Sequence, residues 1–285
     1  MQKRVAAVLI ATLAACGGED REPPFAEVPG QIGSLAVNDT SLFGIDAMGG
    51  IVEINLADAA IVGMLPTLAA AKEIVAAADW VAWIEPEGTG NVVRRRRGDG
   101  TVESTRTFEP HLAARATGLF FSDLQLVAKW NDDGVIERVA TPGLNPRVLD
   151  VDATYAYTVE GDTSVVRYMV GTDQGEVLLP TSMGASIKDE QLAYRTGEGI
   201  RLRNLFTSFD RVVGTPPASV MCNLVIAGSA VMCGKYRALE GVVDELLSDP
   251  VNGAVAVGKD LYWVTLDGDT SQIYKTDAEL VDKDE

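Results

Sequence analysis

Few side chains in this sequence are suited to catalysis. His111 is the only histidine among 285 residues, so a metal site built from several imidazoles is excluded. A lone histidine can act as a general base, but we expect His111 to be a solvated loop residue. The segment from Gly228 to Tyr236 looks like a phosphate-binding loop, yet it has five residues between its glycines where four are required. We therefore assign no catalytic, cofactor-binding or metal-ligating residue.

The first cysteine, Cys16, follows a segment with the features of a secretory signal. Lys3 and Arg4 precede the apolar run 5–15, which is shorter than the roughly 20 residues that a lasting membrane helix needs. The run ends in Leu-Ala-Ala-Cys, which resembles the lipobox of bacterial lipoproteins. In that family diacylglycerol is attached to the cysteine thiol, and signal peptidase II cuts just before it. The alternative is an ordinary signal peptide with an incidental cysteine.

The resemblance to lipoproteins implies a location as well as a modification. Residues 1–15 would be removed, and Cys16 would become a lipidated N-terminus that binds a membrane. An aspartate after the cysteine retains enteric lipoproteins at the inner membrane, and Gly17 stands there instead. The resemblance therefore implies a cell-envelope protein attached to the outer membrane.

The other two cysteines, Cys222 and Cys233, flank an expected hairpin. A two-residue turn at Ala227-Gly228 would place them directly opposite each other, within disulfide range. With Cys16 lipidated they are an even pair in an oxidising compartment. We predict a disulfide between them, and the alternative is two buried thiols.

Two kinds of charge cluster invite a functional interpretation. Arg94 to Arg97 are four consecutive arginines, which could bind an anionic surface, but a charged, solvated outer strand is the favoured interpretation. Acidic turns could hold Ca²⁺ through oxygen ligands, although none has the spacing of an EF-hand loop and such residues are ordinary in β-turns. These turns are Asn131-Asp132-Asp133-Gly134, Glu160-Gly161-Asp162 and Asp267-Gly268-Asp269. We predict no cofactor, with Ca²⁺ as the alternative.

Composition limits the partners of the protein. The formal net charge is −17, and it becomes −19 when Lys3 and Arg4 are removed with the signal, so nucleic acid is excluded as a partner. The sequence is nevertheless 47% hydrophobic, which is enough for a real core. We expect residues 16–31, which are rich in glycine and proline, to be a flexible tether, and residues 32–285 to be one folded domain.

Within residues 32–285 a short motif recurs seven times: an apolar strand, a turn rich in Asp, Asn or Gly, a second strand and, after a polar gap, a third. Equivalent positions lie 30 to 44 residues apart at Phe43, Trp83, Val127, Tyr157, Tyr194, Met232 and Tyr262. Short strands at this period predict an all-β fold, a single β-propeller with seven blades. Six or eight blades are the alternatives.

One segment and one local motif refine this interpretation. The alanine-rich segment 56–80 favours helix by propensity, but Gly63 and Pro66 interrupt it, and we expect strand, loop and strand, with a short helix as the alternative. The units resemble the loose repeats of YWTD- or NHL-like bacterial propellers. That resemblance is clearest in Asp260-Leu261-Tyr262-Trp263 followed by Gln272-Ile273-Tyr274-Lys275.

Three functions remain open at the level of sequence. The first is a membrane-anchored binding or scaffolding module for a protein or glycan. The second is a propeller hydrolase or lyase that uses acidic residues, with or without Ca²⁺. The third is a purely structural envelope protein. We favour the first, since no catalytic constellation is visible, and the sequence leaves the oligomeric state undefined.

Overall fold

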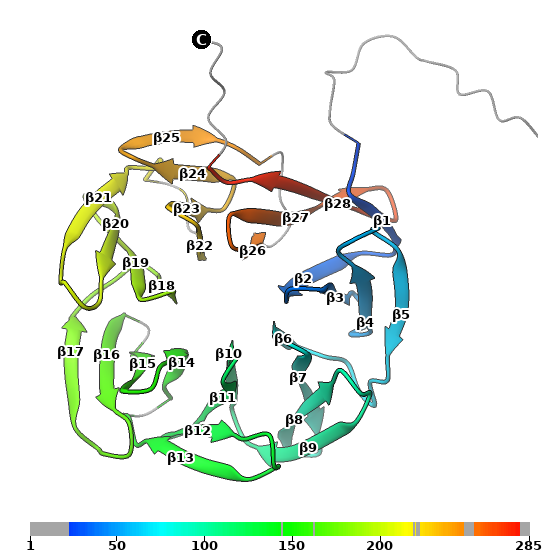
Figure 1. Cartoon of the computed structure of the whole chain (residues 1–285), viewed down its shortest axis with the longest axis horizontal. Helices are drawn as coiled ribbons and strands as arrows, with labels where there is room; N and C mark the ends of the chain where they lie inside the picture. The colour runs from blue at the N-terminus through cyan, green and yellow to red at the C-terminus, as the bar shows by residue number, and fades with distance from the viewer. Residues whose placement is uncertain are drawn as a thin grey trace, which may run out of the picture.

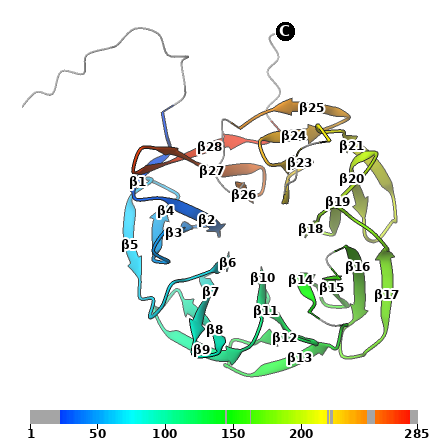
Figure 2. The same cartoon turned by 180° about the vertical axis from the view of Figure 1, so that it is seen from behind.

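The computed structural model describes residues 23–143, 145–161, 163–218, 220, 223–247 and 254–279. All regular secondary structure in these residues is β-strand. Twenty-eight strands form seven antiparallel sheets of four strands each, and the sheets stand as blades around a ring (Figure 1, and from behind in Figure 2). The prediction of a single seven-bladed β-propeller is confirmed.

Each blade runs outward from the central channel in chain order. Blade 1 contains β2 to β5, the following blades take the next four strands in turn, and blade 7 contains β26, β27, β28 and β1. The innermost strands are β2 (Ile32–Val37), β6 (Glu73–Ala77), β10 (His111–Arg115), β14 (Arg147–Val151), β18 (Ala185–Lys188), β22 (Leu224–Ala227) and β26 (Ala254–Val257). The second strands are β3 (Ser41–Asp46), β7 (Trp80–Glu87), β11 (Gly118–Asp123), β15 (Tyr155–Glu160), β19 (Gln191–Thr196), β23 (Ala230–Cys233) and β27 (Asp260–Asp267).

The third and fourth strands complete the blades. The third strands are β4 (Ile51–Asn55), β8 (Gly90–Arg97), β12 (Leu126–Trp130), β16 (Ser164–Met169), β20 (Gly199–Asn204), β24 (Tyr236–Leu239) and β28 (Thr270–Asp277). The outer strands are β5 (Ile61–Leu65), β9 (Val102–Thr107), β13 (Ile136–Ala140), β17 (Gly175–Leu179), β21 (Asp210–Gly214), β25 (Val242–Glu245) and, in blade 7, β1 (Ala26–Pro29).

The hydrophobic core lies between neighbouring blades. On β7, residues Trp80 to Ile84 are all buried, although alternate side chains point to opposite faces of the sheet. Phe43 and Ile51 of blade 1 pack in one cluster with Trp83 of blade 2. A blade is therefore apolar on both faces and buries them only by stacking in a closed ring, which explains the continuous apolar runs of the second strands.

The ring closes between the two ends of the described chain. β1 pairs antiparallel with β28, so that Ala26 faces Ile273. The buried hydroxyl of Ser271 donates to the carbonyl oxygen of Gly30 at 2.8 Å and accepts from the amide of Ile32 at 2.8 Å. The predicted tether boundary at residue 31 is therefore wrong, because residues 26–29 form the outer strand of blade 7.

The predicted repeat was out of phase in blade 3. Val127 lies on β12, a third strand, whereas the strand equivalent to those of Phe43 and Trp83 is β11. The error arose because the inner strand β10 begins with His111 and ends with Arg115, and this polar character made it look like a loop. With β11 in place, the second strands of blades 1 to 6 begin 36 to 39 residues apart, at Ser41, Trp80, Gly118, Tyr155, Gln191 and Ala230.

The fourth strand of each blade was not anticipated, because outer strands such as β9 (VESTRT) are largely polar. The alanine-rich segment does form a strand, a loop and a strand, namely β5, residues 66–72 and β6. Ala propensity is overridden there because both strands belong to sheets. Among the described residues, no helix is long and apolar enough to cross a membrane.

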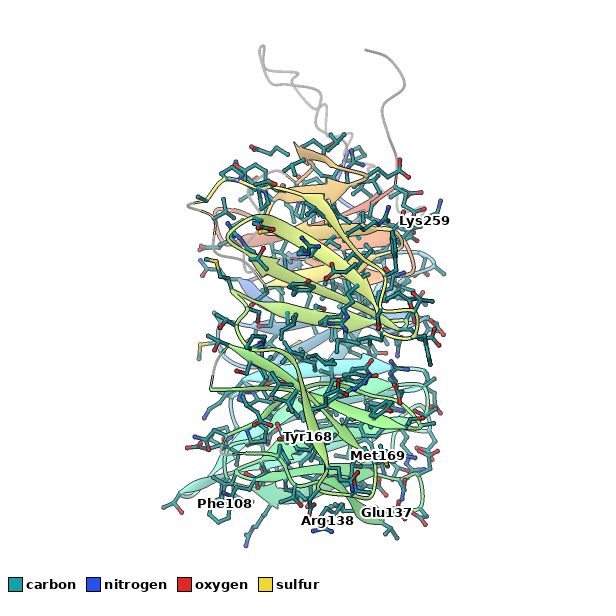
Figure 3. The ribbon with its side chains drawn as sticks, turned by 90° about the vertical axis from the view of Figure 1, so that its left-hand side faces the viewer. Phe108, Glu137, Arg138, Tyr168, Met169 and Lys259 are labelled. Carbon is teal, nitrogen blue, oxygen red and sulfur yellow. The ribbon has the colours of Figure 1, made fainter. Side chains whose placement is uncertain are left out.

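The meander gives the ring two different faces. Turns from the first to the second strand and from the third to the fourth lie on one face, named here the turn face. The remaining connections lie on the opposite face, named the loop face. Figure 3 shows this edge-on, with Lys259 of a first turn and Phe108 of an inter-blade loop on opposite sides.

Candidate functional site

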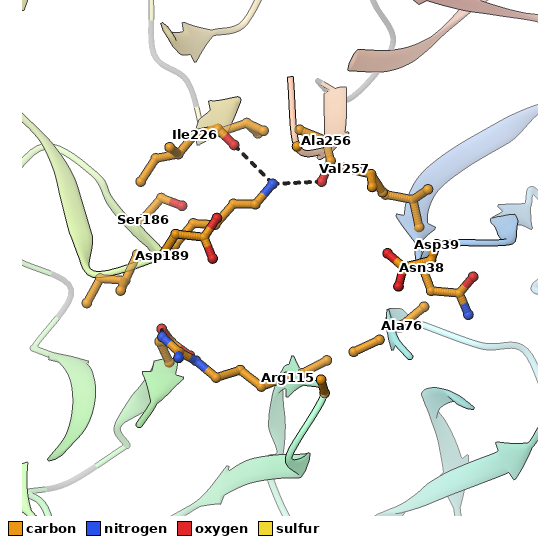
Figure 4. A pocket seen from close by; sticks show the side chains of 18 of the residues that line it. Asn38, Asp39, Ala76, Arg115, Ser186, Asp189, Ile226, Ala256 and Val257 are labelled. Carbon is orange, nitrogen blue, oxygen red and sulfur yellow. Dashed lines mark hydrogen bonds and ion pairs between the residues drawn. The ribbon is translucent and has the colours of Figure 1, made fainter. Parts of the chain in front are cut away.

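A cavity of about 560 Å³ opens where the channel meets the turn face (Figure 4). Its wall consists of the ends of inner strands and the turns that follow them. Small apolar side chains such as Ala76 and Ala114 alternate there with a few charged groups, which are Asp39, Arg115, Asp150, Lys188 and Asp189.

Arg115 and Asp150 form a bidentate ion pair between blades 3 and 4. The guanidinium Nε donates to Asp150 Oδ1 at 2.5 Å, and Nη2 donates to Oδ2. Burial raises the pKa of the Asp150 carboxyl, and the hydrogen bond from Arg115 opposes that rise. The carboxylate also accepts the amide of Val151 at 2.8 Å. Its oxygens are thus occupied, and the pair connects two blades.

Lys188 reaches from blade 5 toward blades 6 and 7. Its ammonium donates to the carbonyl oxygen of Ala256 at 3.0 Å and to that of Ile226 at 3.5 Å, the two dashed lines of Figure 4. Desolvation lowers the pKa of Lys188, and nearby Asp189 opposes that shift. No ion pair of Lys188 occurs within the part of the chain that the structure describes. Lys188 therefore connects three inner strands through main-chain acceptors.

The turn face around this cavity is strongly acidic. Within its described turns and the segment 278–279, Lys259 is the one basic residue. The acidic residues there are Asp39, Asp58, Asp79, Asp99, Asp132, Asp133, Asp152, Asp173, Asp189, Glu190, Glu240 and Glu279. Like charge at this density attracts cations and repels anions.

The loop face has a different charge balance. Its described connections hold three acidic residues, Glu109, Glu198 and Asp269, and two basic ones, Lys72 and Lys235. They also hold large exposed apolar side chains, including those of Met48, Phe108 and Met183. The two faces therefore differ in charge: the turn face is strongly acidic, and the loop face is close to neutral.

The four arginines lie on β8, the third strand of blade 2, and each forms an ion pair. Arg94 pairs with Glu85 at 2.7 Å and Arg96 with Glu53 of blade 1 at 2.6 Å, while Arg95 and Arg97 share Glu103. The expected solvated outer strand is therefore wrong, since β9 lies outside β8.

Arg95 is the most buried member of this run. Its side chain is 1% exposed, and its guanidinium lies 4.7 Å from the centre of the Trp130 ring of blade 3. It also donates to the carbonyl oxygens of Trp130 and Asn131, both at 3.0 Å. The arginine run thus joins blade 2 to both of its neighbours, and no anion-binding patch results.

His111 is the first residue of β10, and not a loop residue as expected. Its Nδ1 lies 3.4 Å from Glu73 Oε2 of blade 2, and the other oxygen of Glu73 accepts the amide of Leu112 at 2.8 Å. The ring is half exposed. This contact bridges two inner strands at the loop-face end.

The cysteine hairpin differs from the predicted register. Its turn is Gly228-Ser229, one residue later than expected, so that Leu224 faces Cys233. The argument from directly opposed positions is therefore wrong. Cys233 is buried in β23, whereas Cys222 and Cys16 lie outside the described residues. The disulfide and the lipidation both stay predictions.

Carboxylates of the acidic turns accept local hydrogen bonds. Asp133 accepts a hydrogen bond from the amide of Val135 at 3.0 Å, and Glu160 accepts one from the Tyr168 hydroxyl at 2.5 Å. Burial, together with this bond to Glu160, raises the pKa of Tyr168 to about 12. Asp162 is outside the described residues. Within those residues no group of three His, Cys, Asp or Glu side chains is placed to hold a metal. Ca²⁺ binding stays untested.

Sequence reasoning missed one surface, at the outer edge of blade 1. Five large apolar side chains are exposed there, on β5 and on the two loops at its end, and we name them the blade-1 apolar edge: Met48, Ile61, Val62, Met64 and Leu68. No other blade exposes more than three such side chains in the described chain. The charge-free sequence IVGML of β5 was the available signal.

Comparison with known proteins gives the fold and no family. No protein-family model matches the chain, and no curated protein matches it. Among solved structures, the computationally designed Ika8 protein is 14% identical with a TM-score of 0.59, over 90% of this chain and 87% of that one. A chain of a mitotic checkpoint complex is 12% identical with a TM-score of 0.61, over 97% and 99%.

Two bacterial structures also match the chain. PorZ, a surface component of the type-IX secretion system of Porphyromonas gingivalis, is 11% identical with a TM-score of 0.61. The match covers 89% of this chain and 39% of PorZ. BamB from Moraxella catarrhalis is 13% identical with a TM-score of 0.52, over 88% of this chain and 84% of that one. Identities this low show a shared propeller fold.

Proposed function

We propose that this chain is a lipid-anchored, extracytoplasmic protein whose propeller is a binding and scaffolding module for a protein partner. The blade-1 apolar edge is the observation that carries the proposal. Clustered exposed apolar side chains commonly mark interaction sites, and here they lie on a protein with a net charge of −17. We favour a protein over a glycan because the exposed side chains of this edge are aliphatic and not polar.

The membrane anchor is the second part of the proposal. Lipid on Cys16 would hold the propeller close to the outer membrane. The described chain enters the ring at Phe25, whose ring packs edge-on against Tyr262 at 5.6 Å between centroids. The residues between Cys16 and Phe25 span at most about 30 Å when extended. The anchor would therefore keep the blades within reach of other envelope proteins.

The ring itself suits a scaffold. Inter-blade contacts of Arg95, Arg115 and Lys188 join neighbouring blades through buried or half-buried polar groups. Such a frame presents its loops in fixed positions. One similar structure, PorZ, is described as an essential bacterial surface component of a secretion system, which supports a role in the envelope.

Two measurements test the proposal together. Growth with radioactive palmitate should label the wild type and leave Cys16→Ser unlabelled. Chemical crosslinking of intact membranes should give a discrete adduct with one protein. A wild-type protein without label would contradict the proposed lipid anchor. A protein that forms no adduct with any crosslinker would contradict the scaffolding role.

A further inference from the structure

The blade-1 apolar edge includes an open strand edge. β5 hydrogen-bonds to β4 on one side and is the last strand of its sheet on the other. An edge strand presents unpaired main-chain N–H and C=O groups, which can pair with a strand from another chain. The register shifts between Glu53 and Ile54, which places a bulge at Val62 on β5.

The other outer strands are protected against such pairing. Every one of them, all within the described chain, has at least one charged residue, and charge on an edge discourages strand addition. These residues are Glu103 and Arg106 on β9, Glu137 and Arg138 on β13, Glu176 on β17, Asp210 and Arg211 on β21, Asp244 and Glu245 on β25, and Glu27 on β1. Among the seven outer strands, β5 alone has no charged residue.

The side chains of β5 extend the open edge into an apolar surface. Val62 is 62% exposed and Met64 is 57% exposed. At the loop-face end, the turn containing Met48 packs against the following loop, where the Ala71 amide donates to the Gly49 carbonyl at 2.9 Å. Met48 and Leu68 lie in these two connections, so the apolar surface continues beyond the strand.

Charge decides which occupant fits this edge. The charged residues of blade 1 are all acidic, namely Asp39, Asp46, Glu53 and Asp58, and residues 32–65 contain no Lys or Arg. Asp58 precedes β5, and the Asp46 carboxylate lies near Met64, because a Cβ on Gly50 would meet both. A second copy of the chain would place like charges together at both ends of the paired strands. A segment with basic flanks would meet opposite charge.

We propose that β5 binds an extended segment of the partner protein by strand addition, with apolar residues at alternating positions and Lys or Arg at the flanks. Main-chain hydrogen bonds to the β5 edge supply affinity, and the exposed side chains select the apolar positions. This inference rests on the proposed function, since it names the surface and the kind of segment that the scaffold binds.

Selection from a library of displayed twelve-residue peptides on the full lipidated protein in detergent micelles tests the proposal. Enriched peptides should alternate apolar residues and have basic flanks. Val62→Lys should weaken their binding at least tenfold. Val177→Lys is the matched control, because Val177 lies on the outer strand β17 and is 58% exposed, and its binding should equal that of the wild type.

A second readout is specific to strand addition. Hydrogen exchange of the amides in 61–65 should slow when an enriched peptide is bound, while 175–179 should exchange as before. Two results would contradict strand addition at β5: peptides that bind Val62→Lys as tightly as they bind the wild type, or bound peptides that leave hydrogen exchange in β5 unchanged. Either result would still be compatible with a binding module that uses another surface. Enriched peptides with acidic flanks would contradict a partner segment with basic flanks. A dimer of the protein that Val62→Lys dissociates would show that β5 pairs with a second copy of the chain instead. Recovery of no peptide, together with no membrane adduct, would overturn the proposed function as well.

Discussion

Two strands of neighbouring blades, β8 and β5, show how charge in a sequence relates to the surface of the fold. β8 ends in four arginines, and each of them pairs with a carboxylate, in one case with Glu53 of the neighbouring blade 1. β5 reads IVGML, and three of its five residues are exposed. The charged strand β8 thus lies inside its blade and connects it to both neighbouring blades, whereas the apolar strand β5 lies at an exposed edge.

The difference follows from position in the blade. A third strand lies between two others and between two neighbouring sheets, so long arginine side chains can reach partners on both sides. An outer strand has one sheet partner and one free edge, so apolar side chains that do not reach a neighbouring blade, such as those of Val62 and Met64, stay exposed, whereas Leu65 at the end of β5 is buried. Residue type alone therefore does not distinguish a strand that connects blades from a recognition surface.

We expect the largest loss of stability when the contacts of β8 with its neighbouring blades are removed. Arg95→Ala should destabilise the protein by about 3 to 5 kcal/mol, because it removes the charged hydrogen bonds to two main-chain carbonyl groups and the packing of the guanidinium on Trp130. Urea unfolding followed by tryptophan fluorescence measures the loss. Arg106→Ala is the control, since Arg106 is 86% exposed in its pair with Glu87 and should cost less than about 1 kcal/mol. Equal costs would show that β8 does not connect the blades.

Loss of the predicted disulfide should have the next largest effect. Reduction of the wild type should lower stability by about 3 kcal/mol, and Cys222→Ser should unfold at the same urea concentration as the reduced wild type. Mass spectrometry under non-reducing conditions checks the bond directly. Two alkylated thiols in the mature protein would show that the disulfide does not form and that β23 is held by sheet pairing and packing.

The pair at the channel mouth should have a smaller and pH-dependent effect. Burial raises the pKa of Asp150 from its usual 3.8, so the folded state binds that proton more tightly than the unfolded chain does. Arg115→Gln removes the opposing hydrogen bond and should cost about 2 to 3 kcal/mol at neutral pH. The cost should shrink as the pH falls and Asp150 becomes protonated.

Urea unfolding at pH 7 and pH 4 measures this dependence. The double variant Arg115→Gln with Asp150→Asn should lose it, because no buried carboxylate remains to titrate. A cost for Arg115→Gln that is the same at both pH values would show that the Asp150 charge is not what Arg115 stabilises.

The smallest effect on stability is expected at the open edge. Val62→Lys and Val177→Lys should each change the free energy of unfolding by less than about 0.5 kcal/mol, because both side chains are already in water. Ile51→Ala, at a fully buried position of the same blade, should cost about 2 to 5 kcal/mol. A large loss for Val62→Lys in thermal unfolding would mean that β5 is part of the core.

The sequence was sufficient for the architecture because second strands such as Trp80–Ile84 are apolar without interruption, and only stacked sheets bury such runs. It was insufficient for blade 3, where His111 and Arg115 at the ends of an inner strand imitate a loop. Hairpin register was missed for a related reason, since Ala227-Gly228 and Gly228-Ser229 are both acceptable turns. Both the strand assignment in blade 3 and the register of this hairpin depend on contacts with residues that are distant in the sequence.

The same limit applies to the candidate surface. The four arginines attract attention in the sequence, yet Glu53, Glu85 and Glu103 reach them only through sheet pairing and blade stacking. The exposure of Val62 and Met64 depends on β5 being the last strand of its sheet, and the charge-free sequence IVGML does not by itself distinguish an exposed edge strand from a buried one. The carboxylates of the turn face are spread over the whole chain, and only the meander collects them.

Site-specific photocrosslinking in intact membranes is the most direct test of whether β5 binds a partner protein. A photoreactive amino acid at position 62 should give a single partner adduct, and the same residue at position 177 should give none. We expect the adduct at position 62 to disappear when Met64 is also changed to Lys. Equal yields at the two positions, or an adduct at position 177 alone, would contradict the assignment of β5 as the recognition edge.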